Sequence, residues 1–150
     1  MSRKQLLIEH KVRGTVREVF AGFTQELFEA LAPSFPPAKL ERYDGNAVGD
    51  KVIIRLGVPP LTQRWVSLIT EHEVTDELAY FVDEGRQLPA PLNYWRHKHL
   101  LRQTSPEEVT ITEDITFGTP VGFVTTLMTP VIRAQFAARG PKYTAYFSVR

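Results

Sequence analysis

Apolar and polar residues alternate along most of this chain, and the alternation predicts a β-sheet. Residues two apart on a strand share a face, so an alternating run marks a strand with one buried face. Glycine, proline and asparagine residues separate the runs as turns. Seven strands are predicted, at residues 5–12, 39–43, 51–58, 61–74, 79–84, 94–103 and 108–117. The connection 85–92 contains two prolines, and we expect it to be irregular.

Helical spacing replaces alternation directly after the first strand. Thr15 and Glu18 form a capping-box pattern, in which the hydroxyl and the carboxylate each accept a backbone amide. Apolar residues then recur at helical spacing as far as Leu31. We expect two short helices, or one bent helix, between Thr15 and Leu31. Three prolines should end this segment: Pro33, Pro36 and Pro37.

The period becomes helical again beyond residue 120, which predicts one long C-terminal helix. Its apolar stripe comprises Val124, Leu127, Met128, Val131, Ile132, Gln135, Phe136, Arg139 and Tyr143. Proline removes a backbone donor and clashes with the preceding turn, so we expect breaks near Pro130 and near Gly140 and Pro141. Pro130 would suit the first turn of the longer segment. Arg133 and Arg139 should be solvated or extend along the surface.

The order of these elements defines the fold class. One strand, two short helices, six strands and one long helix make an α+β protein. At 150 residues the chain has the size of one domain, so we expect a single domain over 1–150. A sheet of seven strands must twist and curl. We expect it to be antiparallel and curved round the long C-terminal helix, with a space between sheet and helix.

Composition excludes several classes of partner. The chain has 18 basic and 17 acidic residues, a net charge of +1, so it lacks the basic field that binds nucleic acid. It has no cysteine, which excludes disulfides and fits a reducing compartment. No run approaches the roughly 18 apolar residues that a membrane helix needs, and no signal-peptide pattern is present. We expect a cytoplasmic monomer or homodimer that is not a membrane protein.

Four titratable residues fall on the inward faces of the predicted strands. Parity places Asp83, His97, His99 and Glu113 on the same faces as tryptophan and phenylalanine. A purely structural sheet would carry aliphatic side chains there, so the pattern indicates a lined cavity. The candidate ligand-binding residues are Trp65, Ser67, Phe81, Asp83, Trp95, His97, His99, Glu113, Phe117, Leu127 and Val131.

Three interpretations of His97 and His99 are open. They are core histidines paired with Asp83 and Glu113, which is the common fate of buried imidazoles. Alternatively, they orient a ligand oxygen or move a proton, with a carboxylate fixing the ring tautomer. In the third interpretation two histidines and a carboxylate bind a metal ion. The third has no motif support, so we expect neither a metal nor another cofactor.

The strand segments also resemble a known family. The segments that carry the resemblance are 65–71, 81–84, 95–99, 112–115 and 120–122, of which Trp-x-His-x-His at 95–99 is the most specific. They resemble the SRPBCC, or START/Bet v 1-like, superfamily, and most closely its small bacterial ligand-binding or polyketide cyclase/dehydrase-like members. The resemblance covers essentially the whole chain. It departs from the family pattern at Leu101, at Glu113 and at Gly85-Arg86.

The resemblance implies a helix-grip fold and a hydrophobic or lipid-like small molecule bound between sheet and C-terminal helix. It does not imply a reaction, because the superfamily includes lipid carriers, hormone receptors, cyclases and co-chaperones. We expect a binding protein. The alternative is a cyclase or dehydratase that uses His97 or His99 with Glu113 or Asp83 as acid, base and orienting group. We expect Glu113→Gln to change ligand binding more than stability.

Overall fold

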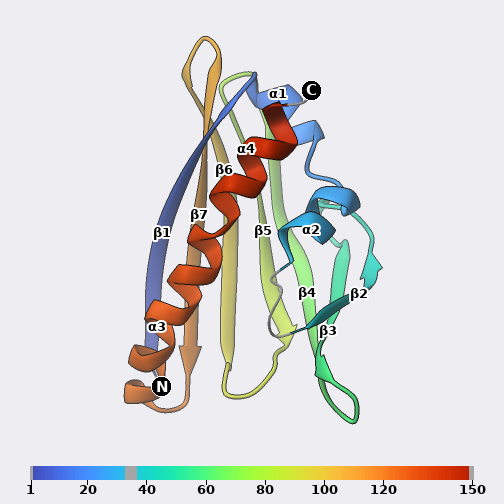
Figure 1. The fold of residues 1–150 in the computed structure, drawn as a ribbon, viewed down its shortest axis with the longest axis vertical. Helices are drawn as coiled ribbons and strands as arrows, with labels where there is room; N and C mark the ends of the chain where they lie inside the picture. Colours follow the sequence, from blue (N-terminus) through green and yellow to red (C-terminus); the bar gives the residue numbers. More distant parts are fainter. Residues whose placement is uncertain (1, 33–36, 149–150) are drawn as a thin grey trace.

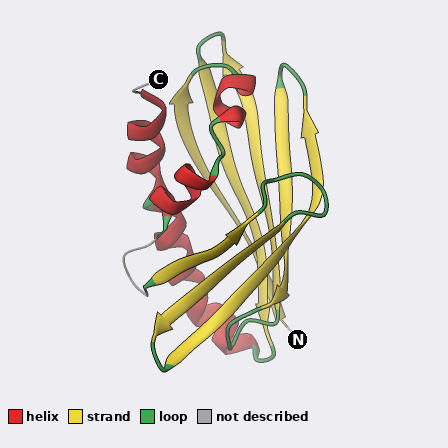
Figure 2. Ribbon diagram, turned by 90° about the vertical axis from the view of Figure 1, so that its right-hand side faces the viewer, coloured by secondary structure: helices red, strands yellow, loops and turns green. Residues whose placement is uncertain are grey.

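Seven antiparallel strands form one sheet in the computed structural model, which describes residues 2–32 and 37–148. The strands are β1 (Ser2–Arg13), β2 (Ala38–Tyr43), β3 (Lys51–Val58), β4 (Leu61–Val74), β5 (Leu78–Gln87), β6 (Tyr94–Ser105) and β7 (Glu108–Thr119). Their spatial order is β1-β7-β6-β5-β4-β3-β2. The first strand of the chain therefore pairs with the last, and β1 and β2 are the two edge strands. β2, β3 and the adjoining part of β4 curl across the face of the sheet (Figure 2). The predicted α+β class and curved sheet are confirmed.

Pairing across the sheet extends several strands beyond their predicted ends. β3 and β4 have the predicted bounds, but β5 continues through Gln87. Gly85 pairs with Ser67 on β4, so part of the expected irregular connection is strand. β1 begins at Ser2 because Ser2 lies opposite Thr119 at the end of β7. Alternation located each strand, whereas its ends depend on the length of the neighbouring strand.

Two short helices follow β1, as predicted. They are α1 (Val16–Ala21) and α2 (Gln25–Leu31). The capping box is present, because Thr15 Oγ1 accepts from the amide of Glu18 and Glu18 Oε1 accepts from the amide of Thr15. Thr24 caps α2 in a similar way. Pro37 directly precedes β2, while Pro33 and Pro36 lie outside the described residues.

The C-terminal helix consists of α3 (Gly122–Ala137) and α4 (Arg139–Ser148), which meet at Ala138. The expected break near Pro130 is wrong, because α3 continues through it. Pro130 lies on the exposed side of α3, where water can satisfy the carbonyl that loses its partner. The other break precedes Gly140 and Pro141, which lie in the first turn of α4, where proline is tolerated. Among the described residues, the helices are too short or too polar to cross a bilayer.

The helices lie on one side of the sheet, with α3 and α4 running along β1 (Figures 1 and 2). The approach is close at Gly140, where an added Cβ would lie 3.2 Å from His10 Nδ1. Glycine therefore lets α4 pass directly over a side chain of β1. This contact holds the start of α4 against the sheet, next to the residues that form the site.

Two apolar clusters form the core, and a layer of polar residues separates them. The α1–α2 cluster comprises Val12, Val16, Val19, Phe20, Phe23, Leu27, Leu31, Ile69, Ala79, Phe81, Leu101, Val109, Ile111, Tyr143 and Phe147. The tryptophan cluster comprises Leu6, Trp95, Ile115, Phe117 and Ile132, with Trp65, Met128 and Phe136 packed against it. Ser67, Asp83, His97, His99, Glu113 and Arg139 lie at the intervening positions of the strands and helix. We call these six residues the polar band.

We predict that Thr15→Ala lowers the free energy of unfolding by about 1 kcal/mol, because α1 loses its N-cap. Urea denaturation monitored by circular dichroism measures the change. Thr144→Ala is the matched control: its hydroxyl donates back to the carbonyl of Gly140 on the exposed face of α4. The control should be nearly neutral. Equal effects of the two substitutions would contradict a capping role.

Candidate functional site

A cavity of about 770 Å³ lies between the concave face of the sheet and the helices α2 and α3. Its walls are mostly aromatic and aliphatic side chains from β2 to β6, α2, α3 and the β5–β6 connection. Polar side chains of the cavity wall include Ser67, Asp83, His97, His99 and Arg139, all members of the polar band. The cavity therefore combines large apolar walls with a few converging polar groups.

Most of the sequence-predicted binding residues line this cavity. Trp65, Ser67, Phe81, Asp83, Trp95, His97, His99 and Val131 do so. Glu113 and Phe117 have no exposed surface and lie behind the wall. Leu127 is 66% exposed and lies outside the wall, because α3 turns Met128, Ile132 and Phe136 toward the sheet instead. These three belong to the predicted stripe, but the sequence alone did not fix which edge of the stripe faces inward.

The four titratable residues on the strands form one hydrogen-bonded cluster. Asp83 lies opposite His97 in the register, and Glu113 lies opposite His99. The hydrogen bonds run diagonally: His97 Nε2 is 2.9 Å from Glu113 Oε1, and His99 Nε2 is 2.6 Å from Asp83 Oδ2. His97 Nδ1 lies 3.7 Å from Asp83 Oδ2. The predicted convergence of these residues on one side of the sheet is therefore confirmed.

Glu113 is a fully buried carboxylate with three hydrogen-bonding side chains. His97 Nε2 donates to Oε1, while Arg139 and the Tyr143 hydroxyl, each 3.1 Å away, donate to Oε2. Burial alone would raise the pKa of Glu113, but the charge of Arg139 and the hydrogen bond from His97 hold it well below its usual range. Burial and the nearby carboxylate raise the pKa of Tyr143, so its hydroxyl remains a donor. Glu113 is therefore ionised inside the core.

Arg139 is largely buried, whereas the sequence predicted a solvated or surface side chain. Its side chain is 16% exposed and pairs with Glu113 instead of extending into solvent. Its guanidinium also lies over the ring of Phe136, with 4.3 Å from Cζ to the ring centroid. Helical spacing was the evidence that Arg139 could face the sheet, because it belongs to the same stripe as Phe136 and Tyr143. A long basic residue at the edge of a stripe is usually solvated, and its buried partner became evident only in the fold.

His99 and Asp83 form the dyad that faces the cavity. Burial, and next the neighbouring His97, lower the pKa of His99 to about 4, although the hydrogen bond that His99 donates to Asp83 opposes the shift. His99 is therefore neutral near pH 7. Burial alone would raise the pKa of Asp83, but the hydrogen bond from His99 and the nearby basic side chains lower it, so Asp83 is ionised. His99 donates through Nε2, which leaves Nδ1 buried without a hydrogen-bond partner.

Aromatic rings fix the orientation of both imidazoles. The His99 ring stacks on Phe81 at a centroid distance of 4.1 Å and on His97 at 3.6 Å. Phe136 and Trp95 meet the His97 ring edge to face. Trp95 in turn contacts Trp65 at 4.7 Å, and the Trp65 indole donates to Ser67 Oγ. The polar groups of the site are thus held by packing as well as by hydrogen bonds.

His10 is a further buried histidine that the candidate residues did not include. Its Nε2 lies 4.0 Å from Glu113 Oε2 and has no hydrogen-bond partner. Burial lowers its pKa more strongly than the charge of Glu113 raises it, so His10 is neutral near pH 7. Alternation places His10 on the same face as Leu6 and Ile8, so its inward orientation could have been predicted from the sequence.

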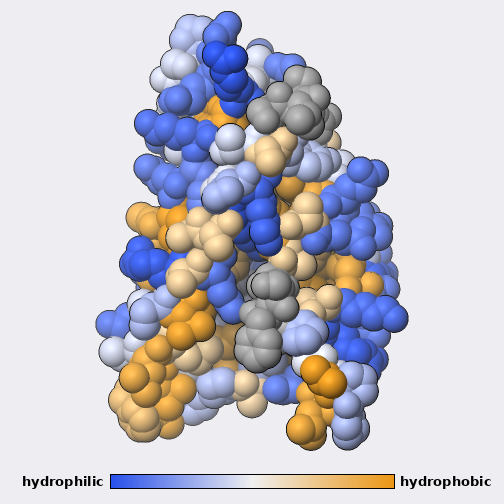
Figure 3. Space-filling model, in the orientation of Figure 1, coloured by the Kyte–Doolittle hydropathy of each residue, from blue (hydrophilic) through white to orange (hydrophobic). Residues whose placement is uncertain are grey.

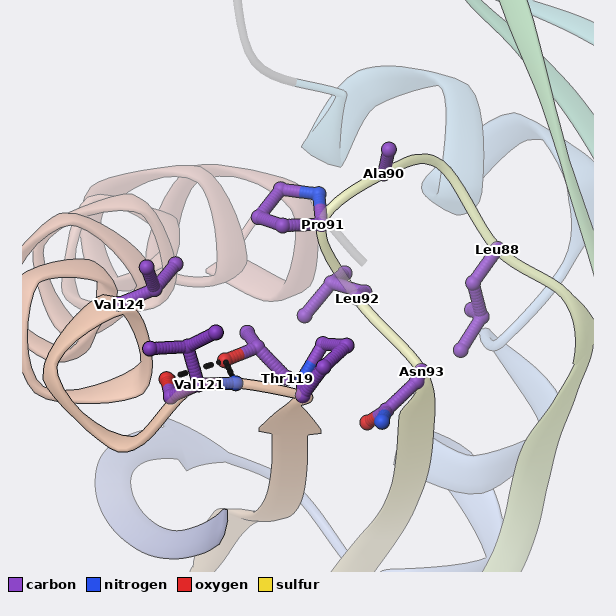
Figure 4. Close-up of a pocket in the computed structure, with 9 residues that line it drawn as sticks. Leu88, Ala90, Pro91, Leu92, Asn93, Thr119, Val121 and Val124 are labelled. Atoms are coloured by element: carbon purple, nitrogen blue, oxygen red, sulfur yellow. Dashed lines mark hydrogen bonds between the residues drawn. The ribbon is translucent and has the colours of Figure 1, made fainter. Parts of the chain in front are cut away.

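A second, smaller hollow lies near the start of α3. It measures about 400 Å³ and is lined by residues 88, 90–93, 119–121 and 124, which come from the β5–β6 connection, the end of β7 and the start of α3 (Figure 4). None of its lining residues is titratable. The surface view shows apolar side chains gathered over the first turns of α3 and over the β3–β4 turn (Figure 3). Neither feature offers the converging polar groups of the main cavity.

Comparisons with known proteins identify the fold. No protein-family model and no curated protein matches this chain. Among solved structures, the Zhui aromatase/cyclase from Streptomyces sp. R1128 superposes with a TM-score of 0.69 at 10% identity over 99% of this chain and 97% of that one. The di-domain aromatase/cyclase StfQ from the steffimycin biosynthetic pathway gives 0.71 at 12% identity, over 99% of this chain and 51% of that one.

A third similar structure is a truncated norcoclaurine synthase from Thalictrum flavum, with a TM-score of 0.63 at 14% identity over 95% of this chain and 91% of that one. This chain has the helix-grip fold. At such identities the likeness concerns the fold alone. In this helix-grip protein α3 and α4 are the helices that pack against the sheet, and the polar band lies between them and the sheet.

The ion pair with Arg139 makes Glu113 important for stability, whereas the sequence predicted that Glu113→Gln would affect ligand binding more than stability. An amide at position 113 would leave Arg139 buried without its counter-charge, so we now expect a clear loss of stability. We predict that Arg139→Met also destabilises the protein, by about 3 kcal/mol, since it leaves the Glu113 carboxylate unbalanced. The double variant should lose less than the sum of the two single variants.

Chemical denaturation of the single and double variants measures this coupling. Arg133→Met is the matched control, because Arg133 lies on the exposed side of α3. The control should change stability by less than about 0.5 kcal/mol. Additive losses from Arg139→Met and Glu113→Gln would show that the two charges do not depend on one another.

Proposed function

We propose that this protein binds a hydrophobic or amphipathic small molecule in the cavity between the sheet and α3. The single observation that carries the proposal is the combination of a 770 Å³ apolar cavity with ionised Asp83 and the two imidazoles on its wall. Ligand sites in proteins are typically about 300–1,000 Å³, mostly apolar, with a few placed polar groups. The apolar walls would supply affinity, and the polar band would orient an oxygen or nitrogen of the ligand.

The fold supports the same class of ligand. The similar structures include aromatase/cyclases and a norcoclaurine synthase, and one norcoclaurine synthase structure is a complex with dopamine and hydroxybenzaldehyde. Those ligands belong to that protein. What transfers to this chain is the expectation that the space under the C-terminal helix takes organic molecules of similar size. The identity of the ligand would be set by the residues on the wall.

A cyclase or dehydratase activity in the same cavity is the second candidate. The observation that favours it is the His99–Asp83 dyad, in which a carboxylate fixes the ring of a neutral histidine beside the cavity. A neutral imidazole can accept a proton from a ligand, and a carboxylate partner stabilises the cation that forms. Glu113 lies behind the wall, so in this mechanism it would act only through His97.

Mass spectrometry of the intact complex separates binding from turnover. If the protein only binds, wild type and His99→Gln should release the same small molecule after purification from the same cells. If it dehydrates its ligand, His99→Gln should retain a molecule heavier by one water. Because ring closure without loss of water leaves the mass unchanged, this comparison tests the dehydratase reaction, for a ligand of any identity.

We predict that Ala38→Trp weakens binding of the neutral fluorescent probe N-phenyl-1-naphthylamine by about tenfold or more. Ala38 lines the cavity, so an indole there would occupy part of the space that the ligand needs. Titration of the probe into purified protein, with emission as the signal, gives the dissociation constant. Ala47→Trp is the matched control, since Ala47 is exposed and lies outside the cavity wall.

Saturable binding that Ala38→Trp weakens and Ala47→Trp leaves unchanged would support the cavity as the binding site. Non-saturable uptake by wild type, or equal dissociation constants for wild type and Ala38→Trp, would overturn the proposal. Thermal melting of each variant ensures that only folded protein is compared.

A further inference from the structure

Three side chains of the cavity wall bring metal-binding atoms together. Asp83, His97 and His99 each offer one such atom, and these atoms all lie within 4.8 Å of one another. Asp83 Oδ2 is 2.6 Å from His99 Nε2 and 3.7 Å from His97 Nδ1. All three residues line the cavity, whereas Glu113 lies behind them. The geometry therefore gathers the three atoms at the wall, on the side that is open to the cavity.

The lone pairs of this cluster are not matched by donors. Glu113 accepts a hydrogen bond from His97 Nε2, because a carboxylate can only accept, and Nδ1 of the same ring lies 3.7 Å from Asp83 Oδ2. His99 Nδ1 is buried and has no hydrogen-bond partner. Two imidazole nitrogens and a carboxylate oxygen thus lie close together, and the hydrogen bond among them runs from His99 Nε2 to Asp83 Oδ2.

The two carboxylates of the cluster differ in their ion-pair partners. Glu113 is paired with Arg139, which is a permanent cation. Asp83 has only the two histidines within 4.0 Å, and no lysine or arginine in the part of the chain that the structure describes. A nearly buried carboxylate without a lysine or arginine in contact favours binding of a cation.

We propose that Asp83, His97 and His99 bind one divalent transition-metal ion, such as Zn²⁺ or Fe²⁺, at the cavity wall. Imidazole nitrogens favour these ions over Mg²⁺ and Ca²⁺, which prefer oxygen ligands. Bonds of about 2.0–2.2 Å place neighbouring ligand atoms roughly 3.0–3.5 Å apart. The separation of His97 Nδ1 from Asp83 is close to this range. The shorter His99–Asp83 contact would widen when the metal takes the place of the hydrogen on Nε2, and His99 would then carry its hydrogen on Nδ1.

The second nitrogens of both rings face the same carboxylate. His97 Nε2 already donates to Glu113 Oε1, and His99 Nδ1 lies 3.9 Å from that oxygen. With the metal on Nε2, the hydrogen on His99 Nδ1 is directed toward Glu113. Metal-binding histidines commonly donate their other nitrogen to a carboxylate in this way. Glu113, fixed by Arg139 and Tyr143, would thus orient both ligand rings.

Three protein ligands leave coordination positions on the cavity side. Open positions next to an apolar cavity suit a water molecule or an oxygen of the bound small molecule. The inferred metal would therefore sit where the ligand's polar group is expected. The inference shares the cavity of the proposed function but is tested by metal binding alone, without an organic ligand.

The test uses the full chain after removal of metal with a chelator and dialysis. Titration with Co²⁺, followed by visible absorption, should give saturable bands at about one equivalent, and equilibrium dialysis with Zn²⁺ should give the same stoichiometry. Asp83→Asn and His97→Gln should each abolish the bands or weaken binding by about 100-fold or more. Glu113→Gln should weaken binding by about 10–100-fold, because Glu113 orients the ligands without touching the metal.

His72→Gln is the matched control, since His72 is exposed and lies outside the cavity wall. It should bind Co²⁺ and Zn²⁺ as wild type does. Wild-type protein that shows no Co²⁺ bands, or that binds no better than Asp83→Asn, overturns the metal site. Because this comparison needs only wild type and the conservative Asp83→Asn, it holds even where a histidine variant fails to fold. Probe binding by the same metal-free protein separately tests the proposed function.

Discussion

The burial of one ionised carboxylate, Glu113, is the constraint on which the rest of the site depends. A charge without contact with water is costly unless it is paired and hydrogen-bonded. Its partners come from β6 and from α4, so one carboxylate joins the sheet to the C-terminal helix. The sheet, α4 and the ring of His97 therefore all meet at a single buried charge.

Asp83 and Glu113 have different surroundings in the structure, although the sequence could not distinguish them. Asp83 and Glu113 are both inward carboxylates beside histidines, but only Asp83 reaches the cavity. Glu113 has a permanent cation as its partner, whereas Asp83 has only imidazoles. One carboxylate thus supports the structure, and the other is available to a ligand or an ion.

Strand residues were predictable and helix residues were not, for a geometric reason. A strand has a period of two, so parity alone placed Asp83, His97 and Glu113 on one face. A helix presents a broad stripe, and its rotation against the sheet is set only by packing. Leu127 was therefore expected inside but is exposed, and Arg139 was expected outside but is buried. A break at Pro130 was expected but does not occur. Pro130 lies on the exposed side of α3, where water can bind the carbonyl that lacks a backbone donor.

The position of the polar band has a consequence for the shape of any occupant. The cavity wall includes Phe23 and Leu27 of the α1–α2 cluster and, beyond the band, Trp95 and Phe136 of the tryptophan cluster. An occupant whose polar atoms meet the band would have apolar walls on both sides of those atoms. Ring systems bearing an oxygen or nitrogen at an internal position match this layout better than a fatty acid, whose head group is terminal.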